Sequence, residues 1–313
     1  MISYRIVIVN WNSGEQLRRC LNSINEIHMQ NFEIDKVIVV DNASSDNSQN
    51  VFCEFKYSYE LIQNVENEGF AFACNQGACG CMSDYILFLN PDTMLYVDTM
   101  EKLTDFLLTK DSSIGIVGIQ LLDEYNRIAK TCSRFPSNIQ KLCKIFGFSK
   151  LFPSTSASML EWAHNESRIV DQVIGAFFVV ETELFKKLNG FDERFFMYYE
   201  EVDFSKRAYN IGKKSYYFAE ARAFHKGGGT SEQVLDKRLF YVLSSFLKYQ
   251  KKHNGIMAMY IALFLEFLEY FSRFILLIFK SKGTGINKLN SAYKMLFSNL
   301  KHILINKNKL CRM

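Results

Sequence analysis

Two hydrophobic patterns alternate along residues 4–121 of this chain. Short runs of consecutive β-branched and other apolar residues are typical of strands buried on both faces, and apolar residues at helical spacing separate these runs. The runs predict strands at Tyr4–Val9, Lys36–Val40, Leu61–Val65, Tyr85–Leu89 and Ile114–Leu121. The helical patterns predict helices at Glu15–Ile27, Phe70–Cys81 and Val97–Thr109. Because this alternation indicates βαβ units, we expect an α/β fold with a mostly parallel sheet covered on both faces.

The pattern is less regular in the second half of the chain. Ser133–Arg168 has no clear periodicity and predicts a long loop region, which in a compact domain is usually functional or mobile. An apolar run follows at Val173–Val180, and a helix is expected at Glu200–Ile211. A strand is expected at Ser215–Phe218 and an amphipathic helix at Leu235–Lys251.

The segment Ile256–Phe279 is apolar and exceeds the roughly 20 residues that a bilayer-spanning helix needs. Glu266, Glu269 and Arg273 interrupt it, and each would cost roughly 2.5–3.5 kcal/mol at a bilayer centre. We therefore expect a helix or helical hairpin that lies on the membrane rather than one that spans it. A helix packed within the protein is the alternative.

Charge is divided unevenly along the chain. Residues 248–313 contain 12 Lys and Arg residues and two acids, which leaves 25 basic and 31 acidic residues in residues 1–247. We divide the chain there into a catalytic domain, 1–247, and a basic, apolar helical tail, 248–313. Such a tail favours an anionic partner. Since nothing resembles a nucleic-acid-binding module, we expect a membrane surface and no nucleic acid.

The eight cysteines are scattered and form no CxxC pair, which favours reduced, packed thiols over a zinc or redox site. The amino-terminal residues lead directly into a strand, without the charged region and cleavage site of a signal peptide. We therefore expect a peripheral protein on the cytoplasmic face of the cell membrane.

Polar and small residues follow four successive predicted strands. Ligands bind at the carboxyl ends of parallel strands, where loops and helix starts meet, so this arrangement predicts a polar cleft. The four segments are NWNSG at 10–14, DNASSD at 41–46, NEGFA at 67–71 and NPDT at 90–93.

Two carboxylates in these segments, Asp41 and Asp92, are open to two interpretations. Either could simply cap a helix or form a turn. A carboxylate at a strand end could also accept hydrogen bonds from a nucleobase or bind a divalent cation, Mg²⁺ or Mn²⁺, that bridges a diphosphate.

A second polar group lies further along the chain. Glu200, Glu201 and Asp203 fall at the start of a predicted helix, where the helix dipole alone would favour acids. A pair of glutamates beside aromatic residues can also hold one carboxylate ready to act as a general base, because like charge and burial raise its pKa. His225 precedes a glycine-rich segment, 227–229, that would suit a loop closing over a phosphate or metal, although an isolated histidine is often structural.

Seven segments of the sequence, taken in order, resemble inverting family 2 glycosyltransferases of the GT-A fold, in their bacterial rhamnosyltransferase-like branch. They are VIVNWNSG, VVDNASSDNS, NEGFAFACNQG, ILFLNPDT, SRFPS, GAFFVVETELFKKLNGFDERFFMYYEEVDFSKR and FHKGGGTS.

The resemblance implies a role for each matching residue. Asp92, with His225, would hold the divalent cation, and Glu201 would be the general base, with Glu200 or Asp203 sharing the work. The remaining matches would form the binding site for the nucleotide-sugar donor: Asn10, Asn12, Asp41, Asn67, Gly69, Asn75, Asn90, Arg134, Gly175 and His225.

The implied reaction transfers L-rhamnose from dTDP-L-rhamnose, with inversion, to a hydroxyl of a polyprenyl-diphosphate-linked glycan during synthesis of a bacterial cell-surface polysaccharide. The chain departs from the family pattern twice, with Asn90-Pro91-Asp92 in place of DxD and Glu201 in place of aspartate. These departures leave open a non-catalytic subunit that binds the nucleotide sugar. A Rossmann oxidoreductase or a nucleotidyltransferase is disfavoured because no GxGxxG follows the first strand.

Overall fold

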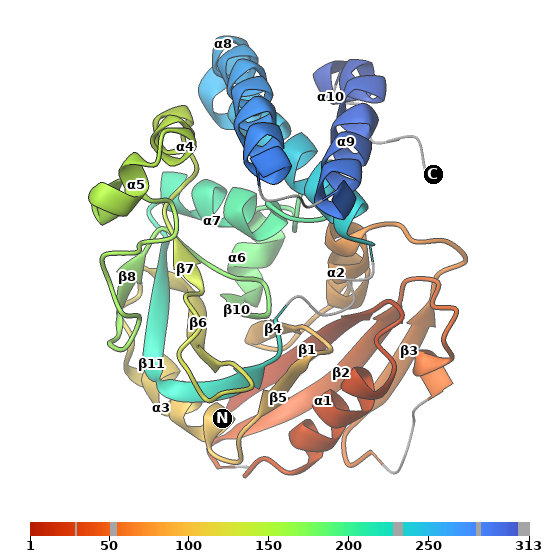
Figure 1. The fold of residues 1–313 in the computed structure, drawn as a ribbon. Coiled ribbons are helices and arrows are strands. Elements are labelled where there is room, and N and C mark those ends of the chain that lie inside the picture. The colour runs from red at the N-terminus through yellow and green to blue at the C-terminus, as the bar shows by residue number, and fades with distance from the viewer. Residues whose placement is uncertain (29, 51–54, 228–233, 280–282, 306–313) are drawn as a thin grey trace.

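The computed structural model describes residues 1–28, 30–50, 55–227, 234–279 and 283–305. A twisted sheet lies at its centre, with strand order β3-β2-β1-β4-β10-β6-β11-β5 and with β8 paired to β11 (Figure 1). The strands are β1 Ile2–Asn10, β2 Phe32–Asp41, β3 Tyr59–Gln63, β4 Tyr85–Leu89, β5 Thr93–Leu95, β6 Ile114–Leu122, β8 Arg168–Val170, β10 Phe177–Glu181 and β11 Lys214–His225. A separate ribbon joins β7, Cys132–Ser133, to β9, Gln172–Val173.

Strands β1 to β4 pair with one another in parallel, and β6 and β11 also pair in parallel. Strand β10 runs antiparallel between β4 and β6. At the far edge, β5 and β8 both run antiparallel to β11. The expected α/β fold with a mostly parallel sheet is confirmed.

Alternate residues of β1 enter two different cores, because successive side chains of a strand point to opposite faces. Ile6 and Ile8 pack with α1, Glu15–Asn25, and α3, Thr99–Thr109. Val7 and Val9 pack on the other face. That face is covered by α2 Phe70–Ala78, α6 Thr182–Lys187 and α7 Glu200–Asn210.

The predicted strands and helices of residues 4–121 are all present; Tyr85–Leu89 has the predicted ends, and each of the others is shifted at one end or both. The third strand begins earlier than expected, at Tyr59, and excludes Val65, which is fully exposed. The strand expected at Ser215–Phe218 is β11, which continues to His225 and carries this histidine to the site described below.

The long loop expected at Ser133–Arg168 is wrong in part. The segment contains α4, Asn138–Ile145, α5, Phe148–Leu151, and a 3₁₀ turn, Pro153–Thr155. Helix α4 starts with a capping box, in which the Ser137 hydroxyl accepts from the Gln140 backbone N–H and the Gln140 side chain accepts from the Ser137 N–H. This cap starts a helix whose interior has too few residues to show a clear period.

The carboxyl-terminal region is helical: α8 Leu235–Phe279, α9 Gly283–Ser298 and α10 Leu300–Ile305. Helix α8 breaks at Gly255, whose φ of 88° is not helical. We call residues 235–254 the inner part of α8 and residues 256–279 the outer part. The expected domain boundary, between residues 247 and 248, falls within the inner part.

The outer part coincides with the apolar segment that suggested a membrane-bound helix. Nowhere in the described ranges does the structure contain a helix with both the length and the apolar character needed to cross a bilayer. Both parts of α8 share one hydrophobic cluster with α9 and α10, which includes Phe246, Met259, Leu296 and Ile303.

Candidate functional site

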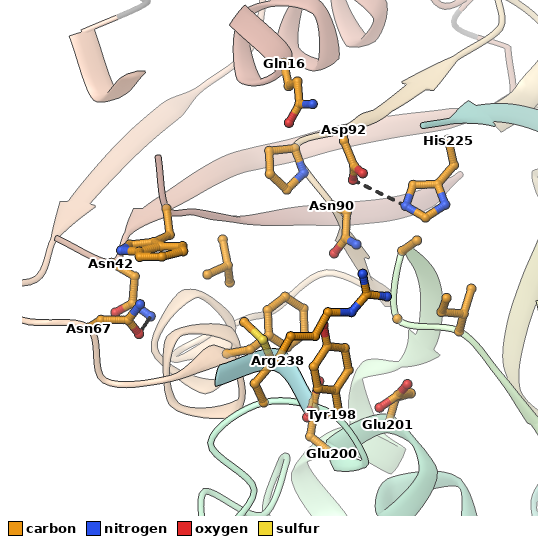
Figure 2. Close-up of a pocket in the computed structure, with 18 residues that line it drawn as sticks. Gln16, Asn42, Asn67, Asn90, Asp92, Tyr198, Glu200, Glu201, His225 and Arg238 are labelled. Carbon is orange, nitrogen blue, oxygen red and sulfur yellow. Dashed lines mark hydrogen bonds and ion pairs between the residues drawn. The ribbon is translucent and has the colours of Figure 1, made fainter. Parts of the chain in front are cut away.

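A cavity of about 240 Å³ lies where the carboxyl ends of β1, β2 and β4 meet the starts of α7 and α8 (Figure 2). Trp11, Asn42 and Asn67 line it on the side of the first three strands. Asn90 and Asp92 line it after β4. The strand ends that suggested a polar cleft therefore meet around one cavity.

Asn10 and Asp41 lie behind this cavity and do not line it. Both are buried, and Asn10 Nδ2 donates to Asp41 Oδ1 over 2.7 Å and to the Ser48 hydroxyl over 2.8 Å. The Ser44 backbone N–H donates to the other Asp41 oxygen over 3.0 Å. These hydrogen bonds fix the loops that follow β1 and β2.

The neighbouring amides extend this network toward the cavity. Asn12 Oδ1 accepts from the Ser45 backbone N–H over 2.7 Å, outside the cavity lining. Asn42 Nδ2 donates to Asn67 Oδ1 over 3.0 Å, and the Gly69 backbone N–H donates to the same oxygen over 3.0 Å. The loop after β3 is thereby tied to the loop after β2.

Gly69 directly precedes α2 and allows another loop to approach closely. Its φ is 95°, and a Cβ atom there would lie 2.6 Å from the carbonyl oxygen of Phe196. The Phe70 backbone N–H donates to that same oxygen over 2.7 Å. Any larger residue at position 69 would separate α2 from the loop that leads into α7.

Asp92 and His225 come together through strand pairing. His225 pairs with Thr93 across β11 and β5, and its Nε2 lies 3.3 Å from Asp92 Oδ1. Figure 2 shows this pair at one wall of the cavity. The glycine-rich segment after His225 lies mostly at residues 228–233, outside the described residues.

This pair fits a divalent cation that is shared with a diphosphate. Mg²⁺ and Mn²⁺ in such sites take one or two protein ligands and complete their coordination with phosphate oxygens and water. Asp92 offers a carboxylate oxygen and His225 an imidazole nitrogen. Among the described residues, no group of three or more His, Cys, Asp or Glu side chains could hold a metal by itself, so phosphate ligands would be required.

Glu200 and Glu201 line the cavity from the first turn of α7. Tyr198 and Tyr199, just before them, have φ of 65° and 74°, a left-handed turn that is uncommon for residues with side chains. Burial, followed by the nearby Glu201 carboxylate, raises the pKa of Glu200 well above its usual range. Burial also raises the pKa of Glu201 to about 7, although backbone N–H groups at the helix start oppose this.

The inner part of α8 supports this strained turn. The ring of Tyr241 stacks on Phe196 with centroids 4.8 Å apart. The Ser245 hydroxyl donates to the Met197 carbonyl over 3.1 Å, and Lys248 Nζ donates to the Arg194 carbonyl over 2.6 Å. The conformation that presents the two glutamates thus depends on residues 235–254.

Asp203 faces away from the cavity, toward α8. It is fully buried, and its carboxylate oxygens lie 2.8 Å from Arg207 Nε, 2.6 Å from Lys252 Nζ and 2.7 Å from His253 Nε2. Burial acts to raise the pKa of Asp203, but the hydrogen bond with His253 and the charges of Arg207 and Lys252 outweigh it, so this pKa is lowered. Asp203 joins α7 to the inner part of α8.

Of the remaining residues predicted from the sequence, one lines the cavity and two lie outside it. Gly175 lines the cavity. Asn75 lies outside it, where its side chain accepts from the Phe191 backbone N–H over 2.8 Å and donates to the Phe191 carbonyl over 2.9 Å. Arg134 also lies outside, paired with Glu161 and donating to the Ser156 carbonyl over 2.9 Å.

Arg238, in the first turn of α8, is the main lining residue that the sequence did not indicate. Figure 2 shows its guanidinium extending into the cavity between Asn90 and Tyr198. Arg238 lies in a helix expected to be merely amphipathic. The contribution of Arg238 becomes evident only from the folded structure, in which the start of α8 lies beside the cavity.

Comparison with known proteins identifies the family of this chain. A sequence model of the family described as Glycosyl transferase family 2 matches residues 5–161. The N-acetylglucosaminyl-diphospho-decaprenol L-rhamnosyltransferase of Mycobacterium tuberculosis is 24% identical over 264 residues, which cover 80% of this chain and 85% of that protein. Rhamnosyltransferase WbbL of Escherichia coli K12 is 22% identical over 253 residues, covering 78% of this chain and 91% of that protein.

A solved structure supports the fold independently. The mannosyltransferase PcManGT from Pyrobaculum calidifontis, in complex with GDP-Man and Mn²⁺, superposes with a TM-score of 0.56 at 12% identity. The superposition covers 97% of this chain and 85% of that one. At this identity the likeness concerns the fold alone, which is the one that the sequence resemblance implied.

Proposed function

The chain belongs to glycosyl transferase family 2, and on that premise we propose that it transfers a sugar with inversion, using Glu201 as the general base. One observation carries this proposal: a glutamate with a pKa near 7 shares a single cavity with the Asp92–His225 pair. A base and a diphosphate site in one cavity are the two parts that single displacement at an anomeric carbon needs.

The proton transfer falls to the carboxylate of Glu201. It removes the proton of an acceptor hydroxyl while that oxygen bonds to the anomeric carbon, and the bond to the nucleoside diphosphate breaks on the opposite face. Burial and the neighbouring Glu201 carboxylate raise the pKa of Glu200 well above its usual range. This favours the neutral form of Glu200 and disfavours a second negative charge beside the base.

The negative charge of the leaving diphosphate would be met by three groups. A divalent cation held by Asp92 and His225 would act as a Lewis acid on the phosphate oxygens. Arg238 extends into the same cavity and is permanently charged, so it would bind those oxygens directly. On the other side, Trp11 and Asn42 offer an aromatic face and an amide to the nucleobase.

The donor we propose is dTDP-L-rhamnose, and the acceptor a polyprenyl-diphosphate-linked glycan of a bacterial cell-surface polysaccharide. Support comes from the rhamnosyltransferase names of the two relatives, one of which names a decaprenyl-diphosphate-linked N-acetylglucosamine. A lipid-linked acceptor implies that the protein works at a membrane surface, on the cytoplasmic face where nucleotide sugars are made. The basic carboxyl-terminal helices suit that location.

The alternative is a subunit that binds a nucleotide sugar without turning it over. Asn90 in place of the first carboxylate of DxD favours it, because one fewer acid leaves a cation more weakly bound. The geometry of Glu201 disfavours it. Burial of this carboxylate raises its pKa and the turn before it is strained, both of which reduce stability, and a binding protein would gain nothing in return.

The test is donor turnover by the full chain. We would incubate it with a panel of nucleotide sugars plus Mg²⁺, Mn²⁺ or EDTA, and measure the nucleoside diphosphate released. We expect fastest release from dTDP-L-rhamnose, less release with EDTA, and about 10³-fold slower release in Glu201→Gln. Measurable nucleotide binding without release, even with a polyprenyl-diphosphate-linked N-acetylglucosamine acceptor, would establish the non-catalytic alternative instead.

A further inference from the structure

The α4–α5 segment carries apolar side chains that nothing in the described structure covers. Helix α4 has no buried residue, and its Ile139, Leu142 and the following Phe146 form one exposed stripe at helical spacing. Leu151 of α5 is 73% exposed and Phe152 is 59% exposed. Large apolar groups gathered in this way indicate a binding surface rather than an ordinary protein exterior.

The outer part of α8 carries a second uncovered stripe. Its inward residues, which include Met259, Ala262 and Leu265, are buried. On the opposite side the helix exposes a series of large apolar residues at helical spacing: Met257, Tyr260, Ile261, Phe264, Phe267, Phe271, Ile275 and Ile278. The outer part is therefore packed on one side only.

Buried ion pairs join the two elements. Lys141 of α4 lies 2.6 Å from both Glu266 and Glu269, on the inward side of the outer part, and Arg273 also pairs with Glu269. Asn138 Nδ2 donates to the Ala258 carbonyl over 2.8 Å. The two glutamates that interrupted the apolar sequence thus face the protein. Figure 1 shows α4, α5 and α8 together at one end of the molecule.

The charge on α4–α5 and on the described residues of α9 and α10 is positive, although Lys144 also lies 3.3 Å from Glu269. Residues 138–152 contain lysines and no acid, and so do residues 283–305. In the outer part of α8 both acids, Glu266 and Glu269, are buried against Lys141. Apolar side chains beside lysines, without accessible acids, match the boundary between acyl chains and anionic headgroups in a bilayer.

We propose that α4–α5 and the outer part of α8 are two contacts of one membrane-docking end, whose partner is a bilayer that carries anionic phospholipid. This inference deepens the proposed function, because a lipid-linked acceptor is what gives docking its purpose. It also assigns a lipid contact to the catalytic body, at residues 138–152, and not to the carboxyl-terminal helices alone.

The test measures partition of the full chain into vesicles of phosphatidylcholine, with or without phosphatidylglycerol. We expect binding to the anionic vesicles that weakens as salt is added. The paired variants Ile139→Ser/Leu151→Ser and Phe264→Ser/Phe271→Ser should each lower the partition coefficient about 10-fold, because each removes two large apolar groups from the lipid. The matched control Val65→Ser/Tyr125→Ser removes exposed apolar groups from other elements and should bind as the unaltered chain does.

Four results would overturn the proposal. Equal binding to neutral and anionic vesicles would remove its electrostatic part, and unchanged binding by the Ile139/Leu151 variant would remove α4–α5 from the contact. Failure to bind either vesicle would remove the bilayer as partner. A mass in solution that rises with concentration, and falls in both paired variants, would make a second copy of this chain the occupant. Release of nucleoside diphosphate from soluble donor is measured on the same samples and stays constant if only docking changes. This control distinguishes failure of the docking proposal from failure of the proposed function.

Discussion

The inner and outer parts of α8 belong to one helix in sequence but to two different surfaces of the protein. Tyr241 and His253 of the inner part contact Phe196, in the loop before α7, and Asp203, in α7 itself. The outer part contacts α4 and α9 and turns its apolar side to solvent. The change of role falls at Gly255, the one break in the helix.

The contacts of the two parts of α8 place the functional boundary more accurately than the amino-acid composition of the tail does. The basic and apolar character of the tail suggested a division before residue 248, yet Lys248, Lys252 and His253 support the site from within that tail. We therefore propose Gly255 as the functional division between catalytic and docking parts. Variants on one side of Gly255 at a time can test this division.

The largest effect is expected in the segment that the inner part supports. Glu201→Gln should lower kcat about 10³-fold, since general base catalysis contributes roughly 10²–10⁴. Glu200→Gln is the matched variant, and it should lower kcat less than about 10-fold because the raised pKa of Glu200 favours its neutral form, which glutamine resembles. Steady-state release of nucleoside diphosphate measures both. The reverse order of the two effects would assign the base to Glu200.

Arg238, on the inner part, should give the next largest effect. Arg238→Ala should lower kcat about 10²-fold, because it removes a donor to the charge that develops on the leaving diphosphate. Arg238→Lys should recover part of that loss, since it restores the charge but not the paired geometry. Lys288→Ala removes an exposed positive charge from α9 and should leave kcat unchanged. An equal loss in the α9 variant would mean that overall charge, not position, matters.

Asp203 tests whether the junction between α7 and the inner part is structural. Asp203→Asn should cost about 2–3 kcal/mol of unfolding free energy, less than the roughly 3–5 kcal/mol of a fully buried pair because Arg207 and Lys252 are partly exposed. It should also lower kcat, since the adjacent turn carries Glu201. Glu269→Gln, at the junction between α4 and the outer part, should lower stability but not kcat. Thermal unfolding and donor release, measured on both variants, check this contrast.

The smallest effect concerns pH. The pKa of Glu201 is raised in the folded state to about 7, so its contribution to stability is fully present below its unfolded pKa of about 4.5 and is lost as pH rises through 7. Activity has the opposite dependence, because the base must lose its proton, and should rise as pH passes 7. Glu201→Gln should remove this loss of stability in thermal unfolding measured from pH 5 to 8. A loss that persists in the variant would implicate another group.

The sequence predicted the central sheet well because its strands are buried on both faces, as at Ile6 and Val7, and therefore leave unbroken apolar runs. The convergence of the loops after β1, β2, β3 and β4 followed from parallel strand order. The sequence did not indicate α4, because the helix is only eight residues long and buries none of them in the core.

The site was harder to derive than the fold. Asp92 and Glu201 stand in segments that carry their own signal, whereas Arg238 reaches the cavity only through the path of α8. Asp41 shows the converse limit. Its place at a strand end was correctly inferred. The hydrogen bonds that its carboxylate accepts from Asn10 and Ser44 depend on how the loops meet in the folded protein, which hydrophobic periodicity does not show.

The most direct test of the central claim is the anomeric configuration of the transferred sugar. The full chain would be given dTDP-L-rhamnose and polyprenyl-diphosphate-linked N-acetylglucosamine, and the new glycosidic bond examined by proton NMR. Single displacement with Glu201 as base predicts a configuration opposite to that of the donor. A retained configuration would require a covalent or internal-return pathway and would contradict the account.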